Sequence, residues 1–475
     1  MPTSPDLSLV PGAVLDVLRV LRGAGRQAFL AGGAVRDLLL VAHCGAAGRP
    51  QDFDVATDAL PEEVQRLFPR TAPTGIAHGT VTVLTGAGPV EVTTFRGEGP
   101  YLDGRRPSSV TFLGDIEGDL ARRDFTVNAI AWDPLADALR DPFGGVGDLR
   151  GGVLRAVGDA RDRFAEDGLR PLRAVRLACT LRFALHPRTR RAISETLETF
   201  AKVAAERVRE ELTRLLLRGK PASRGLRLLQ RTGLLQHIVP ELLESVRFPQ
   251  NRWHAFDVWE HTVRAVDLAP EEIVARLAAL LHDVGKPRSA QGTPGEHTFH
   301  GHEKVGARMA LEILDRLRYP RRDVAERVAL LIREHAWHYQ PAWGGSAVRR
   351  SIARIGPAEL PALWALRRAD VRARGRTVEE GLANQAALER RFEAELAEAS
   401  ALTVRDLALD GGDVMAALQI SPGKLVGMVL ARLLDRVLDD PKLNTREELL
   451  RLLPEVAKDP STGNSQSGPS GASSL

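Results

Sequence analysis

The chain has 475 residues, a length that exceeds what one hydrophobic core usually supports, so about two to four domains are expected. Hydrophobic residues make up 44% and charged residues 27%, which is an ordinary globular composition, and the net charge is +4. The only cysteines, Cys44 and Cys179, do not form a CxxC pair, and this excludes a disulfide framework and a thiolate metal site.

The first residues lack a basic stretch followed by a long apolar run, and nothing approaches ~20 uninterrupted apolar residues. We therefore expect a cytoplasmic protein that is neither secreted nor inserted in a membrane. Residues 161–231 hold 18 Lys and Arg against 8 Asp and Glu. This segment is a candidate for binding a phosphate backbone, although a solvated, Arg-rich helix surface is an equally weighted interpretation.

The pattern changes along the chain and predicts five regions. Short β-type runs alternate with helical pieces over residues 12–150, which predicts an α/β domain. Arg-rich amphipathic helices follow over 151–245. Residues 246–375 remain helical and contain eight of the 12 histidines. A helical region over 376–457 precedes a Gly- and Ser-rich tail, 458–475, that is typical of disorder.

A glycine pair, Gly32 and Gly33, follows the apolar run AFL and precedes a helical pattern. A strand, a glycine turn and a helix start together direct backbone N–H groups at a phosphate. Taken alone, this feature is more often a plain tight turn.

Two aspartates, Asp52 and Asp54, flank Phe53 in the next β-type run. On a strand, residues two apart point to the same face, so the carboxylates would project together and repel. Such a pair suits Mg²⁺, and two metal ions can serve phosphoryl or nucleotidyl transfer. A lone DxD is more often a pair of exposed strand-end aspartates, but the upstream glycine turn favours the metal site.

Six segments occur in an order that resembles the class II tRNA nucleotidyltransferase and bacterial poly(A) polymerase family. They cover roughly residues 25–245 and are GGAVRD, DFDVAT, EVTTFRGEGPYLDGRRPSSVTF, RRDFTVNAIAWD, DPFGGVGDLRGGVLRAVGD and FAEDGLRPLRAVRLACTLRF. The resemblance implies a polymerase-beta-like nucleotidyltransferase head followed by a helical neck. It also implies attack of an RNA 3′-hydroxyl on the α-phosphate of a nucleotide, with release of pyrophosphate.

The resemblance assigns roles in the head residue by residue. Gly32, Gly33 and Arg36 would hold the triphosphate, and Asp52 and Asp54 would be catalytic and hold Mg²⁺. Arg123, Asp124 and Asn128, with Arg122 in support, would contact the ribose and phosphates. Asn128 could equally be a buried asparagine that satisfies neighbouring backbone, and Glu91 is either a third carboxylate or a surface strand residue.

In the neck, the segment EDGLR resembles the motif that reads the base. Asp167 and Arg170 are three residues apart, so we expect them to be neighbours on one helix face, with the carboxylate accepting the exocyclic amine of C or A. Without the resemblance, such a pair is more often a surface ion pair. ERVREEL resembles a motif that braces these helices, and we expect RNA contacts from Arg173, Arg176 and Arg207, with bracing the larger role of Arg207.

Residues 95–112 resemble the flexible loop that CCA- and A-adding members use, in which Asp103, Arg105 and Arg106 offer charged contacts. A CC-only enzyme is therefore disfavoured. Complete CCA addition leads over A-only addition and polyadenylation. The spacer VAHCGAAGRPQ before the aspartates is longer than usual in the family, and we interpret it as a surface loop.

The histidine-rich region resembles the HD phosphohydrolase superfamily. His261, His282, Asp283 and Asp370 match its four metal ligands, and imidazole with carboxylate favours a divalent transition metal. His302 and His335 fall where some HD proteins bind a second metal or a phosphate, and Lys286 could also meet phosphate. The resemblance implies phosphatase or 2′,3′-cyclic phosphodiesterase activity, with a metal-stabilised scaffold as the alternative.

Together these features predict a template-independent tRNA nucleotidyltransferase whose partners are tRNA, ATP and CTP. The competing hypothesis is a metal-dependent phosphohydrolase with an RNA-binding head. The intact Asp52/Asp54 pair argues against it.

Overall fold

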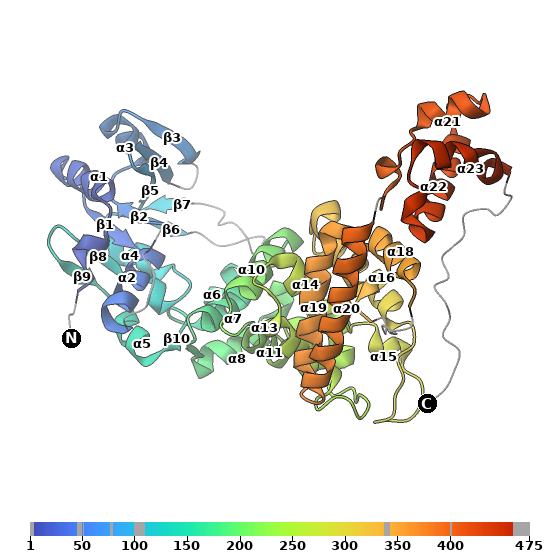
Figure 1. Ribbon diagram of the computed structural model, residues 1–475. Coiled ribbons are helices and arrows are strands. Elements are labelled where there is room, and N and C mark those ends of the chain that lie inside the picture. The colour runs from blue at the N-terminus through green and yellow to red at the C-terminus, as the bar shows by residue number, and fades with distance from the viewer. Residues whose placement is uncertain are drawn as a thin grey trace. The chain divides into compact units, whose positions relative to one another are not determined.

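The computed structural model describes residues 4–44, 50, 52–76, 79–98, 110–336, 343–399 and 401–458. The chain divides into two compact units (Figure 1). The first comprises Met1–Phe248 with Glu271–Leu277 and Leu311–Ala325, and the second comprises Pro249–Pro270, Ala278–Ala310 and Glu326–Leu475.

The first unit begins with a mixed sheet in the order β3-β4-β5-β2-β1-β8-β9, as far as the described residues show. In this sheet β2 and β5 are parallel, and the other neighbouring pairs are antiparallel. The strands are β1 (Ala28–Ala31), β2 (Asp54–Thr57), β3 (Thr71–Gly75), β4 (Thr80–Thr85), β5 (Gly88–Thr94), β8 (Ala131–Asp133) and β9 (Ala138–Arg140). Two small sheets pair β6 (Arg96–Glu98) with β7 (Val110–Phe112) and β10 (Val153–Leu154) with β11 (Ala184–Leu185).

Apolar residues in the sheet form one core. All four residues of β1 are buried, and Phe29 and Ala31 join Ala56, Phe95 and Leu120 in a cluster. The apolar part of the RRDFTVNAIAWD segment also packs here. Its residues Val127, Ala129, Ile130 and Ala131 are fully buried, as the sequence predicts.

Helices surround the sheet and then form the neck. In the head they are α1 (Gly12–Gly23), α2 (Gly33–Cys44), α3 (Pro61–Leu67), α4 (Ile116–Ala121) and α5 (Gly145–Gly151), with 3-10 turns η1 (Leu7–Leu9) and η3 (Thr126–Asn128). In the neck they are α6 (Ala160–Glu166), α7 (Arg170–Thr180), α8 (Pro187–Glu195), α9 (Leu197–Phe200), α10 (Ala205–Arg218), α11 (Ala222–Thr232), α12 (Leu235–Ile238) and η4 (Pro240–Ser245). The predicted α/β head and helical neck are confirmed.

The regular elements in the described part of the second unit are helical, and Gln291 and Thr298 form an isolated β-bridge. The elements from residue 258 onward are α13 (Val258–Leu268), α14 (Ile273–Leu281), α15 (Lys286–Ser289), α16 (His302–Arg316), η5 (Arg321–Ala325), α17 (Glu326–Glu334), α18 (Gly345–Ile355), η6 (Pro357–Glu359), α19 (Leu360–Ala373), α20 (Val378–Glu398), η7 (Val404–Asp406), α21 (Gly411–Leu418), α22 (Lys424–Asp439), η8 (Pro441–Leu443) and α23 (Arg446–Lys458). Of these, η5 belongs to the first unit, and α14 and α16 are divided between the two. The last helices enclose a cluster of their own, drawn only from residues 401–457. None of the described helices combines the length and the apolar character that crossing a bilayer needs.

Candidate functional site

A cavity of about 490 Å³ in the first unit collects most of the residues that the sequence singles out. The predicted residues in its wall are Gly32, Gly33, Arg36, Asp54, Arg123, Asp124, Asn128, Asp167, Arg170, Arg173 and Arg176. Asp52 and Arg207 are not among the lining residues. The wall also contains Glu91, Arg96, Asp119 and Arg122.

The glycine turn brings the backbone close to Arg123. Strand β1 ends at Ala31, Gly32 has a φ of +81°, and α2 begins at Gly33. A Cβ added to Gly32 would lie 2.5 Å from Nη1 of Arg123. The turn therefore needs glycine both for its left-handed backbone and for the guanidinium that crosses it.

Two carboxylates face each other on neighbouring strands at this cavity. Asp54 is the first residue of β2, and it pairs in register with Glu91 of the parallel strand β5. Desolvation by the surrounding protein raises the pKa of Asp54, and so does the charge of Glu91, while Arg123 lowers it. A like-charge oxygen pair of this kind has the donor chemistry that Mg²⁺ requires.

The sequence expects Asp52 and Asp54 on one strand face, but only Asp54 belongs to the strand. The strand begins at Asp54, and Asp52 lies just before it; both aspartates are exposed. The negative charge of Asp52 nevertheless raises the pKa of Asp54. The strand partner Glu91, which the sequence leaves undecided, is the carboxylate that lines the cavity beside Asp54.

Asp124 has a full set of hydrogen bonds in this structure. Its Oδ1 accepts from the Phe125 backbone N–H at 2.9 Å and from Asn128 Nδ2 at 3.0 Å, and its Oδ2 accepts from Arg173 Nε and Nη2 at 3.0 and 2.8 Å. Burial raises the pKa of Asp124, but Arg173 and Asn128 outweigh this effect and hold it below its usual value. Because a carboxylate offers about four acceptor positions, these bonds leave little capacity for a ribose hydroxyl.

Asn128 bridges two elements of the cavity. Its side-chain oxygen accepts from Arg36 Nη1 at 2.7 Å, and its amide nitrogen donates to Asp124. The amide thus links Arg36 on α2 to the aspartate that holds Arg173 on α7. This bridge between side chains explains why an asparagine occupies a buried position in an otherwise apolar segment.

The expectation that Asp167 and Arg170 share a helix face is wrong. Helix α6 ends at Glu166, Asp167 is extended, and a new helix starts at Arg170. Pro171 lies in the first turn of α7, where its missing N–H costs nothing, and it could not continue α6. Gly168 at the break is tightly enclosed, since an added Cβ would lie 2.6 Å from the Thr199 carbonyl oxygen.

The base-reading candidates therefore have separate partners. Asp167 accepts from Arg207 Nη1 and Nη2 on α10 at 3.0 and 2.8 Å. Arg170 donates to Glu166 Oε2 at 2.6 Å and to the backbone oxygens of Arg163 and Arg122, each at 3.0 Å. Both side chains still line the cavity.

The arginines that the sequence assigns to RNA lie in ion pairs. Glu211 on α10 is 2% exposed and accepts from Arg176, and it also lies 3.6 Å from Arg173 Nη1 and 3.4 Å from Arg214 Nη1. Arg173 also binds Asp124, and Arg207 binds Asp167. The Glu211 contacts brace α7 against α10, and the Arg207–Asp167 pair braces α10 against the break between α6 and α7. Bracing is the larger role that the sequence gives Arg207.

The sequence does not single out Asp119, which lines the cavity from α4. It lies three and four residues before Arg122 and Arg123. Side chains three and four residues apart on a helix are neighbours, so this spacing is the sequence signal that could have identified Asp119. The predicted loop residues Asp103, Arg105 and Arg106 lie outside the described residues.

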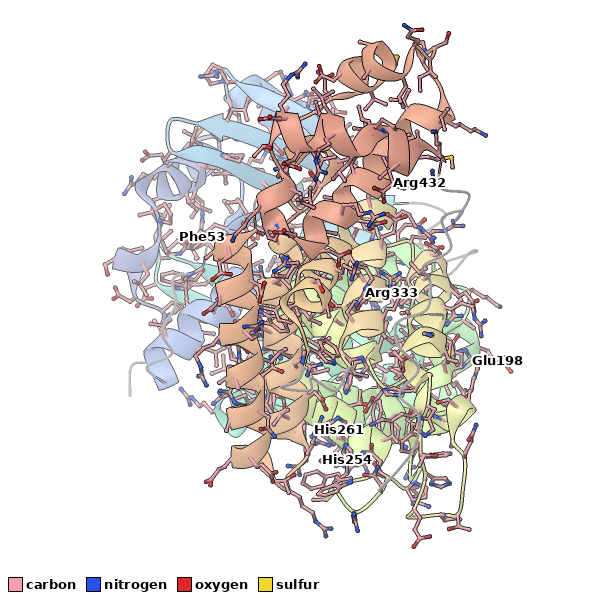
Figure 2. The ribbon with its side chains drawn as sticks, turned by 45° about the vertical axis from the view of Figure 1, so that its right-hand side comes forward. Phe53, Glu198, His254, His261, Arg333 and Arg432 are labelled. Atoms are coloured by element: carbon pink, nitrogen blue, oxygen red, sulfur yellow. The ribbon has the colours of Figure 1, made fainter. Side chains whose placement is uncertain are left out.

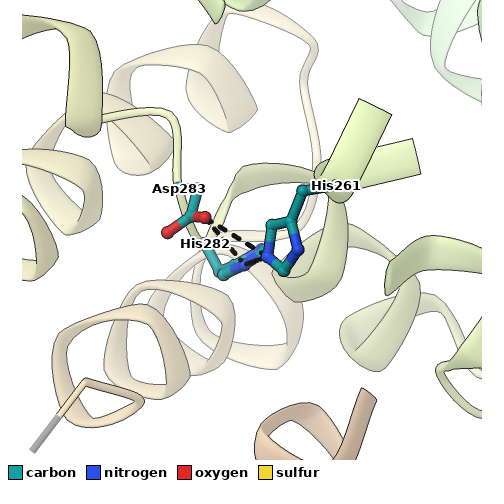
Figure 3. Close-up of side chains that lie close together, drawn as sticks. All are labelled: His261, His282 and Asp283. Carbon is teal, nitrogen blue, oxygen red and sulfur yellow. Dashed lines mark hydrogen bonds and ion pairs between the residues drawn. The ribbon is translucent and has the colours of Figure 1, made fainter. Parts of the chain in front are cut away.

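A second cluster, in the second unit, contains the histidines that resemble HD ligands (Figures 2 and 3). His261 Nε2 and His282 Nε2 lie 3.1 Å apart and 3.4 and 3.2 Å from Asp283 Oδ2. Asp370 Oδ1 is 3.2 Å from His261 Nε2. Two trios could hold a metal ion, His261–His282–Asp283 and Asp283–His302–His335, with ligand atoms within 4.8 Å of one another.

The orientations of three histidine rings are those expected of metal ligands. Nδ1 of His282, His302 and His335 faces the backbone oxygen three residues earlier at 2.9, 2.7 and 2.6 Å, so that nitrogen is the donor. Each Nε2 then presents a lone pair toward Asp283. Lone pairs and carboxylate oxygens repel unless a cation lies among them, so the donor set fits a metal.

Neighbouring charges complete this cluster. Lys286 Nζ donates to Asp283 Oδ2 at 2.7 Å and to Gln250 Oε1 at 2.8 Å. His254, whose ring is 5.3 Å from that of His261, is visible beside it in Figure 2. Burial lowers the pKa of His302 to about 4, with His335 adding to the effect, which keeps the His302 ring neutral.

Family models match three consecutive parts of the chain. They are described as the poly A polymerase head domain, over residues 28–155, a probable RNA- and SrmB-binding site of polymerase A, over 182–245, and the HD domain, over 254–375. The predicted HD resemblance is confirmed.

Named relatives agree with these models. A CCA-adding enzyme of Lactobacillus delbrueckii is 47% identical over 221 residues, which are 46% of this chain and 54% of the relative, so the chain matches about half of that protein. A CCA-adding enzyme of Geobacillus stearothermophilus is 42% identical over 299 residues, or 58% of this chain and 71% of the relative.

The crystal structure of the Bacillus stearothermophilus CCA-adding enzyme in complex with CTP superimposes with a TM-score of 0.69 and 30% identity, covering 93% of this chain and 96% of that one. The resemblance seen in the sequence is thereby confirmed. With head, neck and HD regions in the same order, this chain belongs to the family of CCA-adding enzymes.

Proposed function

We propose that this protein adds CCA to the 3′ end of tRNA, using CTP and ATP and releasing pyrophosphate. The observation that carries the proposal is the single cavity that joins the glycine turn, Asp54 with Glu91, and the Arg123–Asn128 group to Asp167 and Arg170. These are a phosphate cradle, a carboxylate pair and polar groups for a base. A tRNA substrate also implies action in the cytoplasm.

Asp54, Glu91 and Asp52 would hold Mg²⁺ at the start of β2, in the interior of the strand order. A bound Mg²⁺ would neutralise phosphate charge and lower the pKa of the attacking hydroxyl. Gly32, Gly33, Arg36 and Arg123 would orient the triphosphate by hydrogen bonds and positive charge. Asp124 and Asn128 would act chiefly by holding Arg173 and Arg36, since their own hydrogen bonds are already made.

Asp167 and Arg170 would select the base. A carboxylate accepts the exocyclic amine that C and A share, and G and U present a carbonyl at the corresponding position. Because Arg207 already donates to Asp167 at 3.0 and 2.8 Å, base binding requires Asp167 to share or exchange these bonds.

The test supplies purified protein with tRNAs that lack CCA, end in CC, or are complete, together with CTP, ATP or both. We expect C addition from CTP alone, and completion to CCA when both nucleotides are present. Use of only the CC-ending tRNA would indicate A-addition, and unlimited A-addition to unrelated RNAs would indicate a poly(A) polymerase. No incorporation with any of them would refute the proposal.

A second activity is favoured by the two histidine trios that share Asp283. We propose that the HD region binds divalent transition metal ions through His261, His282, Asp283 and Asp370, and a second ion through His302 and His335. A phosphate ester or 2′,3′-cyclic phosphate at an RNA end would be its substrate. Lys286, beside Asp283, would contribute positive charge to the phosphate.

Replacing His282 with alanine is expected to remove metal from this cluster. The variant loses one buried ring that faces both His261 and Asp283, so metal affinity should fall at least tenfold. Metal content is measured by elemental analysis after dialysis against limiting Mn²⁺ or Ni²⁺. Hydrolytic activity is measured with a 2′,3′-cyclic nucleotide as substrate. Nucleotide incorporation should stay unchanged, and equal loss of both activities would contradict two separate sites.

A further inference from the structure

Helix α4, Ile116–Ala121, carries a charged side chain that is buried in the cavity wall. Asp119 is 1% exposed, which is rare for a carboxylate unless cations surround it. The same helix exposes Glu117 to solvent. The two acids therefore offer a comparison between a buried and an exposed charge on one short helix.

Asp119 holds two arginines at once. Its Oδ1 accepts from Arg122 Nε and Nη2 at 3.0 and 2.7 Å, and its Oδ2 accepts from Arg123 Nη2 at 3.2 Å. Both guanidiniums line the cavity, and each side chain is about a fifth exposed, at 18% and 20%. A carboxylate engaged in this way fixes the direction of both forks.

Arg123 is held in its position although one of its donors stays unsatisfied. Its Nη1 donates to the Asn128 backbone oxygen at 3.3 Å and crosses Gly32, while its buried Nε has no hydrogen-bond partner among the described residues. An unpaired buried donor costs free energy, so other contacts must offset it. Asp119 supplies an ion pair that offsets this cost, and the charge of Asp54 also interacts with Arg123.

The end of α4 also holds the base-reading part of the cavity. The Ala121 oxygen accepts from Arg163 Nη1 at 3.1 Å, and the Arg122 oxygen accepts from Arg170 Nη2 at 3.0 Å. Arg170 thus rests on the backbone of a residue whose side chain Asp119 fixes. The turn that orients Arg123 beside the glycine pair also supports Arg170.

We propose that Asp119 is a positioning residue for the incoming nucleotide. It holds Arg122 and Arg123 in the orientation in which they meet phosphates, and through the end of α4 it helps to hold Arg170 against the base. This inference rests on the proposed function, because it takes the cavity to be the nucleotide site.

The test compares Asp119→Asn with Glu117→Gln, its matched control on the exposed side of α4. Affinity for CTP and for ATP is measured by calorimetry with Mg²⁺ and without RNA, so that no turnover is needed. Asp119→Asn should lower the affinity for CTP and for ATP on the order of tenfold, because one charge-assisted contact is lost. Glu117→Gln should bind them like the unaltered protein, and KM for tRNA should be the same in all three.

A third variant, Asp119→Glu, separates positioning from folding. It retains the charge and should recover part of the nucleotide affinity that Asp119→Asn loses, at an unchanged unfolding temperature. Unchanged affinity in Asp119→Asn, or an equal loss in Asp119→Asn and Asp119→Glu together with a lowered unfolding temperature, would overturn the proposal. An unaltered protein that binds nucleotides but adds none to tRNA would refute the proposed function and leave the role of Asp119 measurable.

Discussion

Replacing Asp54 with asparagine is expected to lower nucleotide incorporation on the order of a thousandfold. The substitution keeps the shape of the side chain but removes the negative charge of Asp54, which lies beside Glu91 on the neighbouring strand β5. Metal-supported charge stabilisation is worth several kcal/mol, and each 1.4 kcal/mol is a factor of ten in rate. Single-turnover incorporation of CMP into tRNA lacking CCA measures the effect.

Two further variants make this experiment specific. Asp58→Asn is the matched control, because Asp58 follows the same strand and accepts from the Gln27 backbone N–H at 2.8 Å instead of lining the cavity. It should retain near-normal incorporation. Asp52→Ala should abolish incorporation while tRNA binding is unchanged, as the family motif implies, and normal activity in either the Asp52 or the Asp54 variant would show that the active site is assigned wrongly.

Replacing Glu211 with alanine is expected to cause the largest loss of stability. Glu211 is buried on α10 and pairs with Arg176 and Arg173 of α7, so its removal takes the Glu211 counterion from the largely covered Arg176, while Arg173 keeps Asp124. Breaking a buried pair from one side costs about 3–5 kcal/mol. For a unit of this size, the unfolding temperature should fall by roughly 10 °C.

Differential scanning calorimetry measures this shift, and Glu210→Ala is its control. Glu210 is the exposed neighbour on the same helix, and its loss should change the free energy of unfolding by less than about 0.5 kcal/mol. Equal unfolding temperatures for the two variants would mean that the Glu211 ion pairs do not stabilise the neck.

The parts of the fold that the sequence predicts are those whose signals are local. The short β-type runs AFLAGG and VEVTTF identify β1 and β5, and the glycine pair marks the turn between β1 and α2, where a positive φ is needed. The burial of Val127 and Ile130 also follows from their apolar character. The order of the motifs carried the family assignment without any structural information.

Long-range pairing is what the sequence could not supply. The position of Glu91 beside Asp54 depends on a parallel register between strands far apart in the chain. Likewise, the +10 surplus of residues 161–231, 18 minus 8, does not reveal that Arg173 is neutralised by Asp124 or that Arg207 is neutralised by Asp167. The net charge of a segment depends only on its composition, whereas ion pairs depend on how the chain folds.

The Asp167–Arg170 error has a different cause. Spacing alone predicts a shared helix face, but Pro171 starts a new helix and Gly168 allows the tight passage between the two. Glycine and proline are the strongest local signals of a break, and the three-residue spacing takes no account of them.

The apolar cluster of residues 401–457 has a consequence for how the chain tolerates loss. Every buried member of that cluster comes from this one C-terminal stretch, from Ala401 to Val456. Arg349, which donates to the Leu438 and Asp439 oxygens at the end of α22, is also paired with Glu395 on α20. Shortening the chain at about residue 400 would remove this apolar cluster as a whole together with the packing of α22 on α18, while Arg349 would keep Glu395 as its counterion.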